Sequence, residues 1–188
     1  MKINLIGIDF GAKLAGTTAV CFARGQQLHL LQSTKKQDAD AWLCQRIEEL
    51  QPSSVYMDAP LSLPGVYSGV GSDYHFRASD RAVGAMSPMF LGGLTARAMQ
   101  LRAAFPSVPF YEVYPAQMVR LLQALKEFYK KDLPLFLKAM QGILPFPFDE
   151  LPQNWHQADA ALAWFAGWRH QHGEAESYGD AAEGQIWA

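Results

Sequence analysis

The chain has 188 residues, of which 49% are hydrophobic and 18% are charged, and its formal net charge is −2. This length allows one domain with a substantial core and leaves too little chain for two ordinary domains. No run approaches the roughly 20 apolar residues of a membrane span, and the opening MKINLIGIDF lacks the pattern of a signal peptide. We therefore expect a single soluble, cytoplasmic domain over residues 1–188 that does not interact with a membrane.

The charges are distributed unevenly along the chain. Residues 77–138 hold nine bases and four acids, whereas residues 139–188 hold one base and seven acids. A basic middle segment could form a surface that faces phosphates, and ordinary solvated helix faces would give the same counts. The charge pattern therefore leaves nucleic acid open as a partner.

The first third of the chain predicts strands and one helix. Short apolar runs between turn-forming residues predict strands over residues 3–9, 17–22, 26–32 and 54–58. Asp38 or Asp40 can cap a helix that ends at Pro52. The order of strand, helix and strand favours a parallel addition to an antiparallel meander, since a parallel connection needs a long crossover.

The rest of the chain predicts a long loop, several helices and one more strand. Residues 61–93 are rich in Gly, Pro and Ser, with one short helix at most, and such a long loop is uncommon in a compact domain unless it is functional. Helical spacing and prolines at first turns predict helices over residues 94–105, 115–130, 134–142 and 155–170, with a strand over 110–114. A polar tail starts at about residue 173.

Four acids occupy positions where the pattern otherwise has apolar residues. Asp9 and Asp58 end the first and fourth predicted strands, Glu112 lies in a later strand, and Asp159 lies within the last helix. A buried carboxylate is costly unless it is paired or bound to a metal ion. Convergence around a divalent ion would explain all four, and local hydrogen bonds or solvent exposure would explain each separately. Glu112 could equally be a fourth acidic ligand or general base, or a partner for Arg81 or a loop amide.

Several motifs resemble the ribonuclease H-like superfamily. The segment GIDFGAKLAG, which contains Asp9, Gly11 and Gly16, is similar in spacing to the first strand and turn of bacterial Holliday-junction resolvases. The sugar-kinase and actin group opens in the same way. The segments MDAPLSLP, FRASDRAVG, YEVYPAQ, ADAALAWFAG and EGQIW resemble the DUF429 family of predicted ribonuclease H-like nucleases. This likeness extends from Ile6 to Trp187.

The resemblance implies a particular fold. It is an α/β fold with a mixed five-stranded sheet, in which the first three strands are antiparallel, the last two are parallel to strand 1, and helices cover both faces. A phosphotransferase of the sugar-kinase and actin group would need a second domain, for which 188 residues leave no room.

The resemblance also implies a metal-dependent nuclease that hydrolyses phosphodiester bonds. Asp9, Asp58 and Asp159 would be catalytic and would hold Mg²⁺ or Mn²⁺, with Glu112 as a fourth catalytic candidate. His156 lies three residues before Asp159, so both side chains project from one helix face, and His156 would be a further metal ligand. A histidine in the first turn of a helix is equally compatible with a capping or surface role.

The expected substrate-binding residues come from the long loop. Arg77 and Arg81 could neutralise phosphates, and Tyr74 could stack on a base, although solvated or ion-paired side chains would fit the same sequence. Two other functions remain open: a non-catalytic module that binds nucleic acid or protein, and a hydrolase of a small phosphorylated metabolite or nucleotide. A homodimer is compatible with the resemblance to resolvases that cut junctions symmetrically.

Overall fold

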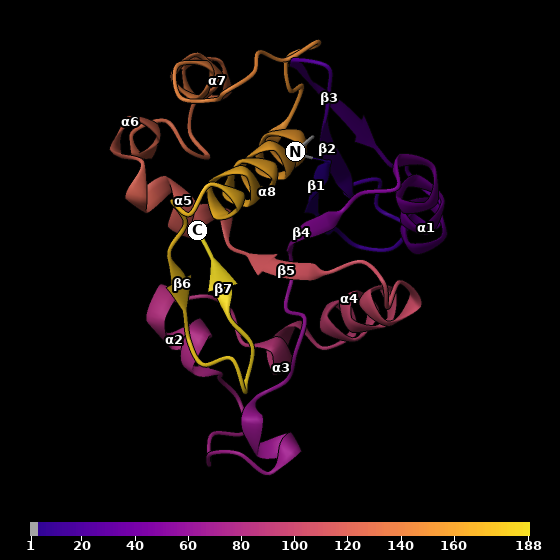
Figure 1. Cartoon of the computed structure of the whole chain (residues 1–188), viewed down its shortest axis with the longest axis vertical. Helices are drawn as coiled ribbons and strands as arrows, with labels where there is room; N and C mark the ends of the chain where they lie inside the picture. Colours follow the sequence, from indigo (N-terminus) through magenta and orange to yellow (C-terminus); the bar gives the residue numbers. More distant parts are fainter. Residues whose placement is uncertain (1–3) are drawn as a thin grey trace.

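The computed structural model describes residues 4–188 and contains a seven-stranded mixed sheet with helices on both faces (Figure 1). The strand order is β3-β2-β1-β4-β5-β7-β6. The strands are β1 (Leu5–Asp9), β2 (Ala19–Arg24), β3 (Gln27–Gln32), β4 (Ser54–Asp58), β5 (Phe110–Val113), β6 (Ser177–Tyr178) and β7 (Ile186–Trp187). The predicted start of the first strand, Ile3, lies outside the described residues.

The pairing of the first five strands confirms the predicted topology. Strands β1, β2 and β3 are antiparallel, and β4 and β5 are parallel to β1. The predicted number of five strands was wrong, because β7 adds in parallel to β5 and β6 then pairs antiparallel with β7. Each of these strands has two residues within the polar tail. So short a run shows no alternation that a sequence pattern could reveal.

The helices follow the predicted order with two differences. They are α1 (Ala39–Leu50), the 3₁₀ helix η1 (Gly65–Ser68), α2 (Ala78–Val83), α3 (Pro88–Leu91), α4 (Gly93–Ala104), α5 (Pro115–Leu121), α6 (Gln123–Lys126), α7 (Leu133–Gln141) and α8 (Trp155–Gln171). The single helix predicted over residues 115–130 is divided at Leu122, where the backbone leaves the helical region, and the long loop contains η1, α2 and α3. None of the described helices is long and apolar enough to cross a membrane.

Helix α8 is the central helix of the fold. It packs on one face of the sheet, while α1 and α4 cover the other face (Figure 1). Helices α5, α6 and α7 add buried side chains to the same core cluster as α8, among them Met118, Leu125 and Phe136. Because α8 has the sheet on one side and these helices on another, all its residues from 158 to 167 are buried.

Gly7 allows α8 to lie directly against β1. A Cβ atom at Gly7 would be 2.1 Å from the backbone nitrogen of Trp164 and 2.4 Å from the carbonyl oxygen of Ala160. Only glycine permits so close an approach of two backbones. Alternate residues of a strand face the same side, so Asp9 projects toward the α8 face as Gly7 does. The close contact therefore brings the first turns of α8 to the end of β1.

Candidate active site

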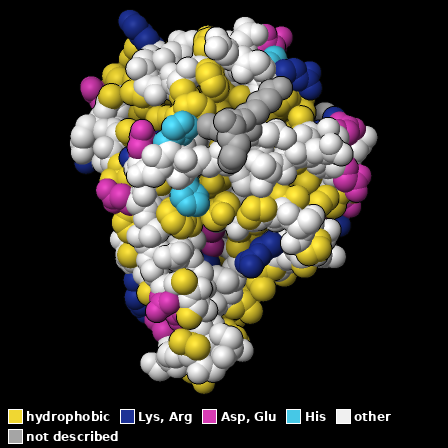
Figure 2. All heavy atoms as spheres, in the orientation of Figure 1, with side chains coloured by type: hydrophobic (Ala, Val, Ile, Leu, Met, Phe, Trp, Pro, Cys, Tyr) yellow, Lys and Arg dark blue, Asp and Glu magenta, His cyan; other side chains and the backbone are white. Residues whose placement is uncertain are grey.

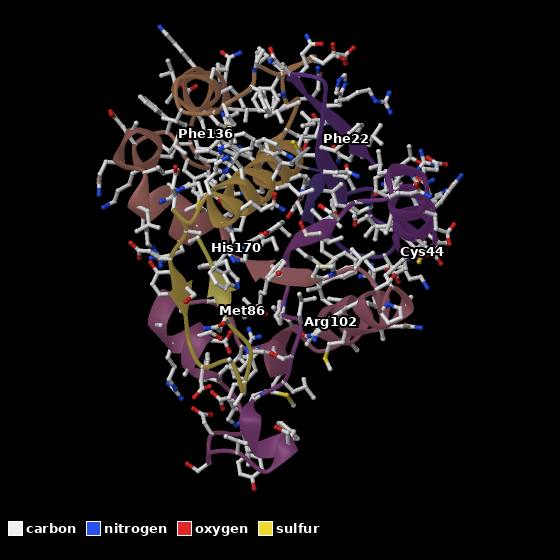
Figure 3. All side chains as sticks on the ribbon, viewed as in Figure 1. Phe22, Cys44, Met86, Arg102, Phe136 and His170 are labelled. Atoms are coloured by element: carbon white, nitrogen blue, oxygen red, sulfur yellow. The ribbon has the colours of Figure 1, made fainter. Side chains whose placement is uncertain are left out.

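Asp9 and Asp58 lie side by side at one edge of the sheet. They are the last residues of the neighbouring parallel strands β1 and β4, and they are partners in the strand register. A cavity of about 250 Å³ opens at this edge and is lined by Asp9, Asp58 and Glu112. Met86, from the segment between α2 and α3, also lines it and is labelled in Figure 3. The edge where parallel strands end is a common place for a ligand site in α/β proteins.

Asp9 is held by His156, which comes from the first turn of α8. The Nδ1 atom of His156 lies 2.7 Å from Oδ2 of Asp9. An ionised carboxylate can only accept hydrogen bonds, so Nδ1 carries the proton. The hydrogen bond to Asp9 raises the pKa of His156 and outweighs the opposing effect of burial. His156 therefore holds Asp9 through Nδ1, and its assignment as a metal ligand stays a prediction.

Of the three acids Asp9, Asp58 and Asp159, which we call the acidic cluster, Asp58 has the fewest partners that offset a negative charge. Burial raises the pKa of Asp58 well above its usual range, and repulsion from Asp9, Asp159 and Glu112 raises it further. Lys130 lowers this pKa through its charge, as the smallest of these effects. Among residues 4–188, the structure shows no side-chain hydrogen bond or ion pair to Asp58.

Asp159 projects from α8 toward the same cluster and is bound by two neighbouring residues. The ammonium Nζ of Lys130 lies 2.5 Å from Oδ2 of Asp159, and the hydroxyl of Tyr129 donates to Oδ1 at 2.9 Å. Burial raises the pKa of Asp159, and Lys130 offsets part of this increase. Both carboxylate oxygens of Asp159 therefore have partners within the protein.

The donor set fits a hard divalent ion that takes few protein ligands. No three His, Cys, Asp or Glu side chains of the described chain are grouped closely enough to hold a metal ion as they stand. Mg²⁺ is usually held by one or two carboxylates, with water and substrate phosphate completing its coordination. Asp9 and Asp58 provide two such carboxylates as register partners at adjacent strand ends, and a bound cation would favour the ionised form of Asp58, which burial and the neighbouring acids disfavour. The residues present therefore fit Mg²⁺ or Mn²⁺ at Asp9 and Asp58.

Glu112 and Arg77 form a buried ion-pair network beside the cavity. Arg77 is 0% exposed; its Nη1 and Nη2 atoms each lie 2.6 Å from a carboxylate oxygen of Glu112, and it also binds Asp80. Burial alone would lower the pKa of Arg77, but the hydrogen bonds that it donates to Glu112 and Asp80 raise this pKa above its usual value. Glu112 also accepts from the amide of Leu61 at 3.0 Å. The loop-amide alternative for Glu112 is therefore present, with Arg77 in place of Arg81 as its arginine partner.

The two arginines expected to bind phosphate, Arg77 and Arg81, lie in different environments. The guanidinium of Arg77 has no exposed surface, so it is not placed to contact a substrate. Arg81 and Tyr74 are exposed on the long loop, where Arg81 pairs with Asp73 and lies over the ring of Phe76. The described residues show no contact of either side chain with the acidic cluster.

The surface carries no single basic patch on the face seen in Figure 2. The Lys and Arg side chains of the described residues are scattered there among hydrophobic and polar ones. Arg97, from the basic middle of the sequence, is held by Asp40 and donates to the carbonyl of Gly11 at 3.1 Å. Part of the basic segment therefore serves internal contacts.

Sequence reasoning missed three residues that act on the site or its surroundings. Tyr129 and Lys130 bind Asp159 from a turn after α6, and a predicted continuous helix over these positions gave no sign of it. Glu183 accepts from the amides of Gly65 and Ala78 and so holds the long loop against the tail. The EGQIW motif, which contains Glu183, was the sequence feature that could have indicated the contacts of Glu183.

Comparisons with known proteins bear on the fold. No family model matches the chain, so the resemblance to the DUF429 family gains no support from this comparison, and no curated protein matches it. The structure is similar to T. thermophilus RuvC in complex with a Holliday junction substrate, with a TM-score of 0.51, 20% identity and coverage of 90% of this chain and 96% of that chain. A second Thermus thermophilus RuvC structure has a TM-score of 0.47, 18% identity and the same coverage. The first likeness, together with the mixed sheet, shows that this chain has the ribonuclease H-like fold.

Proposed function

We propose that this protein is a metal-dependent nuclease that hydrolyses phosphodiester bonds at the edge formed by Asp9 and Asp58. The observation that carries the proposal is the register pairing of these two acids at adjacent strand ends, inside a cavity. The fold is also that of T. thermophilus RuvC, which was solved with a Holliday junction substrate. Nucleic acid is accordingly the substrate class we propose.

Each acid of the cluster has a distinct role in this proposal. Asp9 and Asp58 hold the divalent ion, while His156 keeps Oδ2 of Asp9 engaged and fixes the carboxylate's orientation. A bound Mg²⁺ or Mn²⁺ supplies Lewis-acid polarisation of the scissile phosphate. Asp159 lies in the same cluster, where Lys130 and Tyr129 bind its two carboxylate oxygens. Glu112 has a structural role, because Arg77 and the Leu61 amide bind its oxygens.

Two exposed residues of the long loop are the proposed substrate contacts. Tyr74 is 60% exposed and its ring meets that of Tyr67 edge to face, which leaves aromatic surface free to stack on a base. Arg81 is also exposed, so a substrate phosphate can compete with Asp73 for its guanidinium. Arg77 is not included, because it is buried in the ion-pair network.

The test combines metal binding and cleavage in the wild type and Asp9→Asn. This change keeps the shape of the side chain and removes one ligand charge. We expect calorimetry to show weaker Mg²⁺ and Mn²⁺ binding, and cleavage of labelled single-stranded, duplex, hybrid or branched substrates to fall by at least roughly 100-fold. Glu48→Gln, on the exposed surface of α1, removes one charge elsewhere and should leave both measurements unchanged.

The other candidate functions correspond to other results. Equal metal binding in both proteins, or none in either with no cleavage, would overturn the catalytic proposal and leave a binding module. Cleavage of small phosphorylated compounds without cleavage of any nucleic acid would support the metabolite hydrolase instead.

A further inference from the structure

Lys130 places a cation of the protein itself inside the acidic cluster. Its ammonium is 2.5 Å from Oδ2 of Asp159, and the hydroxyl of Tyr129 occupies Oδ1. The side chain of Asp159 is 7% exposed, whereas that of Lys130 is 46% exposed. The lysine thus reaches inward from the surface to a nearly buried carboxylate.

The surroundings of Lys130 hold it in this position. Its backbone has φ of 59°, a left-handed conformation that a lysine adopts only when its surroundings impose it. Its ammonium lies over the rings of Tyr129 and Trp155, at 5.3 and 5.4 Å from their centroids. Phe136, labelled in Figure 3, packs against both rings from α7. An aromatic cage and a constrained turn therefore aim this one lysine at Asp159.

The charges of the cluster set a limit on how many ions it attracts. Asp9, Asp58 and Asp159 carry three negative charges when all are ionised. One divalent ion at Asp9 and Asp58, together with the ammonium of Lys130, supplies three positive charges, to which His156 beside Asp9 adds a fourth when it is protonated. A second divalent ion that used Asp159 would meet a carboxylate whose two oxygens both have partners, and Lys130 would repel it.

We propose that Lys130 is the resident second cation of this site, so that the protein binds one divalent ion, at Asp9 and Asp58, with Asp159 reserved for the lysine. This inference rests on the proposed metal site. It assigns to Lys130 a positioning role: its ammonium fixes Asp159 and takes the place that a second metal ion would otherwise fill.

The experiment counts ions with the metal alone, in the absence of substrate. Purified wild type, Lys130→Met and Lys130→Arg are titrated with Mn²⁺ and Mg²⁺ by calorimetry, and bound Mn²⁺ is counted by electron paramagnetic resonance. We expect one ion per chain in the wild type and in Lys130→Arg, which keeps the charge. Lys130→Met should bind a second ion per chain, because the charge that repels it is gone.

Thermal melts give an independent readout. Without metal, Lys130→Met should melt below the wild type, because Asp159 loses the cation that offsets its charge, and Mg²⁺ should raise the melting temperature of the variant more than that of the wild type. The matched control is Lys131→Met, at the exposed neighbour, for which residues 4–188 show no ion pair. It should behave as the wild type in every measurement.

The results separate this inference from the proposed function. Two ions per chain in the wild type, or the same ion count in Lys130→Met as in the wild type, would overturn the role of Lys130 while leaving the nuclease proposal intact. Loss of metal binding in Asp9→Asn together with an unchanged Lys130→Met would do the same. Absence of metal binding in all these proteins would overturn both.

Discussion

The imidazole of His156 lies 2.7 Å from the carboxylate of Asp9, and this contact joins the first turn of α8 to the end of β1. The helix and the strand pack with their backbones almost in contact at Gly7, which brings His156 within reach of Asp9. The geometry of the candidate site therefore depends on a residue that carries no side chain and lies two positions before Asp9.

Gly7→Ala should strongly destabilise the protein. The added Cβ would lie 2.1 Å from the backbone nitrogen of Trp164, and neither the helix nor the strand can yield without losing core contacts. We expect a loss of about 3 kcal/mol or more in the free energy of unfolding, at the upper end of the cost of overpacking. Urea denaturation followed by circular dichroism measures it.

Gly93→Ala is the matched control for this change. A Cβ atom at Gly93, in the first turn of α4, would meet nothing within 4 Å, and its φ is not in the left-handed region. Alanine favours helix over glycine, so this variant should be as stable as the wild type or slightly more stable. Equal stability of the two variants would contradict the close-packing explanation.

Asp58→Asn should stabilise the metal-free protein. A carboxyl group whose pKa is raised by folding lowers stability as pH rises from its unfolded value, about 3.9, through its folded value. Burial and three neighbouring acids raise the pKa of Asp58, so the asparagine variant avoids this penalty at neutral pH. We expect a gain of about 1 kcal/mol at about pH 8 and little at about pH 4, with a chelator present.

Melts of the wild type, Asp58→Asn and Glu48→Gln across this pH range test the prediction. Glu48→Gln should show no such pH-dependent gain. A loss of stability in Asp58→Asn at pH 8 would mean that the carboxylate has a partner that compensates its charge.

Most of the sheet could be predicted from the sequence, because β1 to β5 are long enough and apolar enough to be recognised as strands in one sequence. It also selected Asp9 and Asp58, since an acid at the end of a buried strand is conspicuous. It could not show that Lys130 reaches Asp159, because that contact depends on a break after α5 and a left-handed residue in the following turn. Nor could it show that Arg77 is buried. An arginine at the start of a short loop helix is typically solvated, and only the structure shows that Glu112 and Asp80 bind it.

Arg77→Met should destabilise the protein far more than Arg81→Met. Removing Arg77 leaves the buried carboxylates of Asp80 and Glu112 without a cation, and breaking such a network costs about 3–5 kcal/mol. Arg81 is 61% exposed, and its ion pair with Asp73 is screened by solvent, so its loss should leave the melting temperature close to that of the wild type. Chemical denaturation compares the two variants. A stable Arg77→Met protein with weakened nucleic-acid binding would instead support the substrate role expected from the sequence.

His156→Gln should lower stability in a pH-dependent manner. The hydrogen bond to Asp9 raises the pKa of His156 in the folded protein, so the bond contributes stability that is fully present below the unfolded pKa of about 6.5. This contribution is lost as pH rises through the folded value, because the imidazole then gives up its charge. The difference in melting temperature between the wild type and His156→Gln should therefore be larger at about pH 6 than at about pH 9, with a chelator present.

The control for this prediction is His75→Gln, an exposed histidine of the long loop, which should show a small difference at both pH values. A difference between the wild type and His156→Gln that grows with pH would mean that the neutral imidazole is the form that stabilises the fold. His156 would then act on Asp9 as an uncharged hydrogen-bond donor, and the ion pair would contribute nothing to holding the carboxylate in place.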